Sequence, residues 1–164
     1  VPANWQAGFA FTPGDWKFMV DAKQIFYSDV KSIANPMLPN LQTALLGQEE
    51  GAGFGWKDII VMKFGLMYSG FCGWDLMAGY SVGQNPVTSE NVMFNILAPG
   101  VIENHITFGF SKDIAKNHEI SVAFMYAFEN SVVGPNPLDA PNQQTIEIGM
   151  KQWQLEVGYA FSSF

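Results

Sequence analysis

Few side chains in this sequence could carry out covalent chemistry. The histidines are His105 and His118, and Thr107 and Ser111 share the parity of His105 along one segment. A nucleophile and its base must meet at about 2.6–3.2 Å, which spacing within one strand cannot arrange by itself. The sequence also shows no Gly-rich phosphate loop, metal-ligand cluster or paired-carboxylate arrangement. We therefore predict that the protein is not an enzyme and uses no metal or cofactor.

A second group of residues could bind a ligand without reacting with it. These residues share one parity in segments that alternate apolar and polar side chains, and they are Met19, Ile25, Ile59, Val61, Met67, Met77, Met125, Lys17, Lys23 and Lys63. Flexible thioethers suit an irregular, elongated apolar ligand, and lysines could neutralise a carboxylate head group. Two alternatives stay open. The apolar side chains could instead pack against another part of the protein, and the lysines could pair with Asp21 or Asp75.

The elements that must position these residues are strands. About seven segments alternate in polarity, over residues 4–11, 15–29, 56–68, 74–82, 105–111, 118–129 and 145–161. Residues 118–129 show the period of two most clearly, since the even positions from 120 to 128 are all apolar. The links between segments run short, long, short, long, short, long, as in a transmembrane β-barrel with turns at one end and loops at the other. The sequence therefore predicts an all-β, antiparallel barrel segment without a separate second domain over residues 1–164.

Composition also favours a membrane protein. Charged residues make up 14% and aromatic residues 15% of the chain, whereas a typical soluble domain carries about 25% charge. No stretch approaches the roughly 18 consecutive apolar residues of a spanning helix, and the segment lengths suit tilted strands that cross a bilayer in about 9–11 residues. A soluble sandwich would alternate too, but its strands are commonly nearer five or six residues.

Aromatic residues gather near the segment ends, where a membrane barrel carries its two aromatic girdles. They are Trp5, Trp16, Trp56, Trp74, Tyr68, Tyr80 and Phe161. The terminal Phe164 is also typical of outer-membrane barrels, which tend to finish on an aromatic-ended strand. These positions predict that one face of the sheet lies in lipid.

The links between segments have distinct chemistry. Turn residues fill the short links at 12–15, 69–73 and 112–117. The long links are 31–55, 83–104 and 130–144, and the spacing of Leu41, Ala44, Leu45 and Leu46 in the first predicts a short amphipathic helix. Net charge is −7 and every basic residue is lysine, which argues against nucleic acid as a partner. The lone Cys72 can form no intramolecular disulfide.

Several short motifs together resemble the C-terminal half of the FadL-like family of outer-membrane transporters. The motifs are VPANW at 1–5, GWKD at 55–58, WDLMAGY at 74–80, NPV at 85–87, Pro99, NHITFGF at 104–110 and the strand over 119–128. The resemblance implies a monomeric fourteen-stranded barrel of the bacterial outer membrane, of which about seven strands lie here. It also implies passive uptake of long-chain fatty acids or similar hydrophobic molecules, such as aromatic hydrocarbons.

The family's N-terminal hatch and kinked strand are expected upstream of residue 1, so we interpret the chain as a fragment or truncated product. No family site is carried onto these residues. Other functions stay open. The chain could belong to a general porin or an adhesin-like barrel whose loop 31–55 binds a partner, or it could be a soluble lipid-binding β-barrel.

Overall fold

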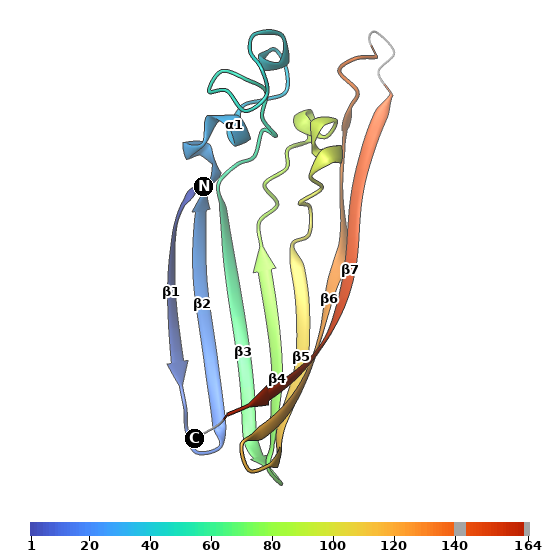
Figure 1. The fold of residues 1–164 in the computed structure, drawn as a ribbon. Coiled ribbons are helices and arrows are strands. Elements are labelled where there is room, and N and C mark those ends of the chain that lie inside the picture. Colours follow the sequence, from blue (N-terminus) through green and yellow to red (C-terminus); the bar gives the residue numbers. More distant parts are fainter. Residues whose placement is uncertain (140–143, 163–164) are drawn as a thin grey trace.

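The structure is a computed structural model that describes residues 1–139 and 144–162. Within these residues seven antiparallel strands form one sheet, and each strand pairs with the next along the chain (Figure 1). The strands are β1 (Ala3–Phe11), β2 (Trp16–Phe26), β3 (Ile59–Phe71), β4 (Trp74–Gly83), β5 (Asn104–Ala115), β6 (His118–Pro135) and β7 (Thr145–Phe161). The helical elements are α1 (Lys31–Ala34) and the 3-10 turns η1 (Tyr27–Asp29), η2 (Asn40–Gln42), η3 (Ser89–Asn91) and η4 (Phe94–Leu97). The predicted all-β class is confirmed, and Phe164 lies outside the described residues.

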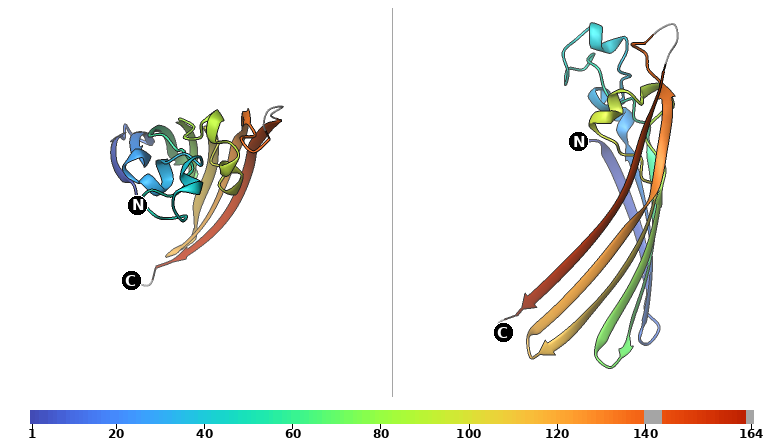
Figure 2. Two further views of the ribbon diagram at one scale, coloured as in Figure 1. Left: turned by 90° about the horizontal axis from the view of Figure 1, so that it is seen from above. Right: turned by 90° about the vertical axis from the view of Figure 1, so that its right-hand side faces the viewer.

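The two ends of the sheet differ as predicted. Short turns join β1 to β2, β3 to β4 and β5 to β6 at one end, which we call the turn end (Figure 1). These turns rely on left-handed backbone, with φ of 59° at Gly14, 48° at Cys72, 76° at Gly73 and 68° at Asn117. The longer connections gather at the opposite end, called the loop end. Seen from above, the sheet curves into a trough (Figure 2). No helix among the described residues is long and apolar enough to cross a membrane.

Several predicted boundaries were wrong. Strand β3 begins at Ile59 rather than at residue 56 and continues to Phe71, and β6 continues to Pro135, inside the predicted loop 130–144. The amphipathic helix predicted from Leu41 to Leu46 does not form, since only η2 is helical there and Leu45 is 75% exposed. Side-chain bonds to the backbone are found there instead: the single hydroxyl proton of Thr43 is shared between the carbonyl oxygens of Asn40 at 2.9 Å and Glu50 at 3.2 Å. Such local bonds compete with helix formation.

The convex face of the sheet carries a belt of aromatic side chains near the turn end. The rings of Trp16 and Tyr68 lie 4.5 Å apart, and those of Trp74 and Phe110 lie 5.3 Å apart. The Lys112 ammonium lies 4.6 Å from the centre of the Trp74 ring, so this charge stays at the edge of the apolar band. The predicted aromatic girdle therefore has a physical counterpart here.

A second belt of aromatic side chains crosses the convex face toward the loop end. Trp5 donates a hydrogen bond from Nε1 to Gln24 at 3.0 Å, and the Tyr80 hydroxyl donates to Asn104 at 2.6 Å. Amphipathic aromatics that meet polar side chains in this way are typical of the boundary between lipid and water. Trp56 was predicted to lie in a girdle, but it precedes β3 and packs inside the loop end instead.

The polarity of the two faces reverses within the hairpin of β6 and β7. Below a register shift between Ala127 and Asn130, the convex face is apolar. Beyond the shift, Val132 pairs with Ile148, and both pack inward against the loops, while Ser131, Glu147 and Lys151 are exposed on the convex side. A bulge changes which parity of a strand faces each side. The hairpin therefore leaves the apolar band near residue 128 and continues as a water-facing element.

The hydrophobic core lies at the loop end rather than inside the trough. It comprises Val87, Val92, Val101 and Ile148, with Trp56, Val132, Ile146 and Met150 packed against it. Gly134 allows this packing, because a Cβ there would collide with the carbonyl oxygen of Ser89 and come within 3.0 Å of Val92. The loop over residues 84–103 is thus docked onto the β6–β7 hairpin.

Candidate functional site

The strand register brings all ten predicted ligand-binding residues onto the concave face. Across the trough, Lys17 pairs with Met67 and Met67 with Met77. The remaining cross-strand neighbours are Met19 with Gly65, Lys23 with Val61, Ile25 with Ile59, Lys63 with Ser81, and Thr107 with Met125. Their ligand role stays a prediction, but their common location does not depend on it.

A groove of about 630 Å³ runs along the concave face in the middle of the sheet. Three of the predicted methionines line it, namely Met19, Met77 and Met125. The groove is deepest at Gly65 and Gly79, a cross-strand pair of β3 and β4 that has no side chains to fill it. Small backbone-lined floors with flexible thioether walls can adapt to apolar molecules of different shape. We call this hollow the groove.

The lumenal lysines do not form the predicted ion pairs. Among the described residues, no ion pair joins Lys17, Lys23 or Lys63 to Asp21 or Asp75, and the ion pairs present involve Lys31. Asp21 is next to Lys63 in the register, but its carboxylate lies over Gly8 on the opposite neighbour strand. The absence of a side chain at residue 8 opens that space. Lys63 therefore keeps its charge facing the groove.

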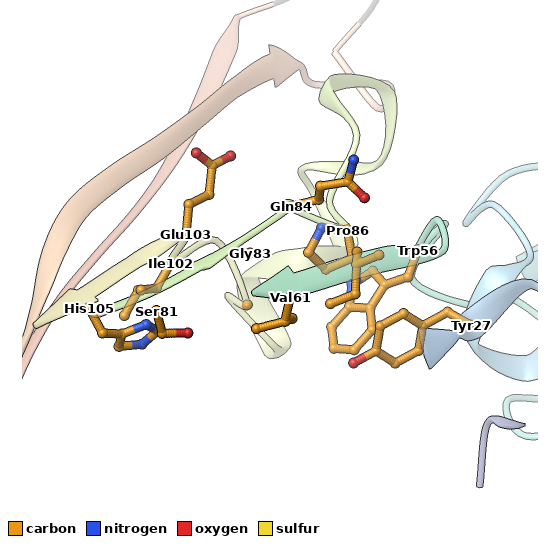
Figure 3. Close-up of a pocket in the computed structure, with 12 residues that line it drawn as sticks. Tyr27, Trp56, Val61, Ser81, Gly83, Gln84, Pro86, Ile102, Glu103 and His105 are labelled. Carbon is orange, nitrogen blue, oxygen red and sulfur yellow. The ribbon is translucent and has the colours of Figure 1, made fainter. Parts of the chain in front are cut away.

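A smaller hollow of about 160 Å³, the upper pocket, lies between the groove and the loop end. Figure 3 shows its lining, which comprises Tyr27, Trp56, Ile59, Val61, Ser81, Gly83, Gln84, Pro86, Gly100, Ile102, Glu103 and His105. Aromatic and aliphatic side chains form one part of this lining. The polar groups of Ser81 and His105 lie on the part that it shares with the groove.

Sequence reasoning missed Tyr27 and Trp56 as lining residues. Their rings meet edge to face at 5.0 Å (Figure 3). The Trp56 indole donates a hydrogen bond from Nε1 to Oδ1 of Asn95 at 2.6 Å. A tryptophan directly after the glycine-rich run 51–55, where strand alternation has not yet begun, was the available signal that it lies in a loop.

A third hollow of about 520 Å³, the outer pocket, lies among the loops. It is lined by Ser28, Ala34, Pro36, Gly55, Trp56, Lys57, Asp58, Thr88, Glu90 and Asn91. Its rim is held by Asp58, which accepts hydrogen bonds from the backbone N–H of Ser28 at 2.9 Å and from its hydroxyl at 3.0 Å.

Neither histidine makes a hydrogen bond to a serine side chain within the described residues. Ser81 is opposite His105 in the register, yet no hydrogen bond joins their side chains in the described part of the chain. His118 lies near the turn end, where its Nδ1 is 2.6 Å from the Tyr159 hydroxyl. Within residues 1–139 and 144–162, no group of three or more His, Cys, Asp or Glu side chains could hold a metal ion.

These features together define one class of fold, part of an antiparallel transmembrane β-barrel. No family model matches the sequence, and no curated protein matches it. Solved structures do share the fold. The toluene transporter TodX of Pseudomonas putida superposes with a TM-score of 0.63 at 20% identity, over 98% of this chain and 34% of TodX.

Two further solved structures agree with this assignment. The deltaS2S3 mutant of the TodX monoaromatic hydrocarbon channel gives a TM-score of 0.61 at 23% identity, over 98% of this chain and 35% of the mutant. The toluene transporter TbuX of Ralstonia pickettii gives 0.55 at 16% identity, over 98% and 34%. TodX and TbuX are FadL-family hydrocarbon transporters, so the predicted FadL-like fold is confirmed. This chain spans about a third of their length.

Proposed function

We propose that this chain forms part of the wall of a bacterial outer-membrane channel through which hydrophobic small molecules diffuse down their gradient. The observation that carries the proposal is the contrast between the two faces of one sheet. The convex face is an apolar band between two belts of aromatic side chains. Such a surface is favourable in contact with lipid and unfavourable in contact with water. The concave face holds the methionine-lined groove of about 630 Å³. The solved structures that share the fold include two toluene transporters and a monoaromatic hydrocarbon channel, which supports the proposal.

The test is uptake by a Gram-negative host that lacks its own hydrophobic-compound channel. We expect cells with the protein in the outer membrane to take up radiolabelled toluene and oleate faster than cells with an empty vector. A hydrophilic sugar should show no such difference, because most of the exposed lining of the groove is apolar. Equal rates for all three probes with and without the protein would contradict the proposal.

Long-chain fatty acids are the finer substrate class that we propose. The feature behind this choice is Lys63, which lines the groove and has no carboxylate within ion-pair distance among the described residues. A fatty acid would lay its chain along the methionines and its carboxylate near this ammonium. Charge-assisted hydrogen bonds of this kind are stronger than neutral ones.

Lys63→Met separates this finer proposal from the general one. Loss of one charge-assisted hydrogen bond should lower oleate uptake at limiting concentration by about tenfold and leave toluene uptake unchanged. Lys151→Met is the matched control, since Lys151 is exposed on the convex side of β7. Equal losses for oleate and toluene would show that Lys63 serves the structure rather than the substrate.

A further inference from the structure

Three of the hollows share lining residues one after another, from the loops to the middle of the sheet. The outer pocket and the upper pocket share Trp56, and the upper pocket and the groove share Ser81 and His105. A molecule that moves from the loops to the groove along these hollows passes Trp56 first. We propose that Trp56 sets the width of the molecules that enter the groove, an inference that rests on the proposed function.

The Trp56 indole is held from several sides. Its ring lies edge to face with that of Tyr27 at 5.0 Å and tilted against that of Phe54 at 5.6 Å between ring centres. The far rim of the indole lies over Gly100, where an added Cβ would be 3.5 Å from Cζ2. These contacts and the bond from Nε1 to Asn95 fix the plane of the ring. The ring lies beside Tyr27 in the lining of the upper pocket (Figure 3).

Asn95 is a positioning residue for this ring. It is fully buried in η4, with an exposed fraction of 0%. Its Nδ2 donates to the carbonyl oxygens of Phe54 at 2.7 Å and Asn91 at 2.8 Å, which leaves Oδ1 to accept from Trp56. Because these donors fix the orientation of the amide, the acceptor for the indole is fixed as well.

The volume of the upper pocket limits the size of a molecule that fits beside Trp56. Its volume of about 160 Å³ is close to that of an apolar cavity of about 150 Å³ that holds benzene. Ile59, Val61 and Ile102 contribute aliphatic side chains to its lining, beside polar residues that include Ser81 and His105. A hollow of this volume accommodates a single aromatic ring or part of an unbranched chain, whereas a fused three-ring hydrocarbon exceeds it unless the indole moves.

The experiment compares uptake of radiolabelled phenanthrene with that of radiolabelled toluene in the Gram-negative host described above. Trp56→Ala should raise the ratio of phenanthrene to toluene uptake by at least about fivefold. Asn95→Ala should raise this ratio by about fivefold, because loss of one net hydrogen bond to the indole raises the population of displaced Trp56 rings by about that factor. Trp56→Phe, which keeps a smaller ring without the N–H, should give an intermediate ratio.

Trp153→Ala is the matched control, because it deletes an indole that is exposed on the convex face of β7, and it should leave the ratio unchanged. A variant that merely inserts poorly lowers both uptake rates together, so the ratio is insensitive to protein amount. If Trp56→Ala does not insert, as judged by gel mobility before and after heating, Trp56→Phe and Asn95→Ala decide the question.

The outcomes separate this inference from the proposed function. An unchanged ratio in the inserted Trp56 and Asn95 variants, with toluene uptake intact, overturns the role of Trp56 and leaves the channel in place. Wild-type protein that takes up neither toluene nor oleate overturns the proposed function and this inference with it.

Discussion

Two adjacent residues of β5 allow a sharp test of which face meets lipid. Phe108 lies on the convex face and is 55% exposed, and Thr107 lies on the concave face and is also exposed. Phe108 is four residues from Asn104, which bonds to Tyr80 of one aromatic belt, and four from Lys112, which lies over Trp74 of the other. At a rise of about 3.4 Å per residue and a tilt of about 40°, this places Phe108 roughly 10 Å from either boundary.

The expected cost of a charge differs strongly between these neighbours. An arginine on the lipid face costs about 2–4 kcal/mol near the midplane of the bilayer, and about 0–1 kcal/mol near its boundaries. Phe108→Arg should therefore destabilise the protein by about 2–4 kcal/mol relative to Phe108→Ala. Thr107→Arg should cost less than about 1 kcal/mol relative to Thr107→Ala, because that side chain enters the lumen.

The assay is the free energy of unfolding from phospholipid vesicles, measured by guanidinium titration with tryptophan fluorescence. Using the alanine variants as references removes the loss of the native side chain from the comparison. Costs that agree within about 0.5 kcal/mol at both positions, the usual spread for ordinary surface substitutions, would refute the assignment of convex face to lipid and concave face to lumen.

Three further predictions concern the loop end. Gly134→Ala should undock residues 84–103, since its Cβ would collide with the Ser89 carbonyl oxygen, and hydrogen exchange there should accelerate; unchanged exchange would contradict this packing. Val92→Ala, at a fully buried site, should cost about 2 kcal/mol in the same unfolding titration, and a cost near zero would count against the core. The hydrogen bond and ion pair between Lys31 and Glu49, 2.8 Å long, lower the pKa of Glu49 and raise that of Lys31. The pair therefore stabilises the folded loop above the unfolded pKa of Glu49, and this stabilisation is lost as pH falls through the lowered pKa of the folded state. Protection factors in loop 31–55 should then drop more in acid for the wild type than for Glu49→Gln, in which Glu50 still lies 3.4 Å from Lys31, and equal drops would show that Glu49 is not the group responsible.

The strand pattern could be predicted because lipid imposes a simple rule on one parity of each strand. The even positions from 120 to 128 are all apolar, and the strand register places those from 120 to 126 together on the convex face, as the sequence indicated. The rule fails where the strands leave the apolar band. Beyond the bulge in β6, Val132 faces inward although Phe128 faces outward, and a local pattern contains no signal for that change.

The candidate site was predictable only in part, for a related reason. The methionines and lysines of the strands follow the parity rule, so their common face could be read from the sequence. Trp56 and Asn95 lie in different loops, 39 residues apart, and meet through a single hydrogen bond. Lys63 lacks the expected partner because Asp21 leans over Gly8, which depends on a side-chain choice rather than on spacing.

The central claim is that this sheet is the wall of a membrane channel, with lipid on its convex side and a lumen on its concave side. The most direct test attaches a fluorophore at single cysteines along β6, in a Cys72→Ser background, and measures quenching by nitroxide-labelled lipids. We predict quenching at positions 122, 124 and 126, and none at 121, 123, 125, 131 and 133. Quenching of both parities over 121–126, or of neither, would contradict the claim.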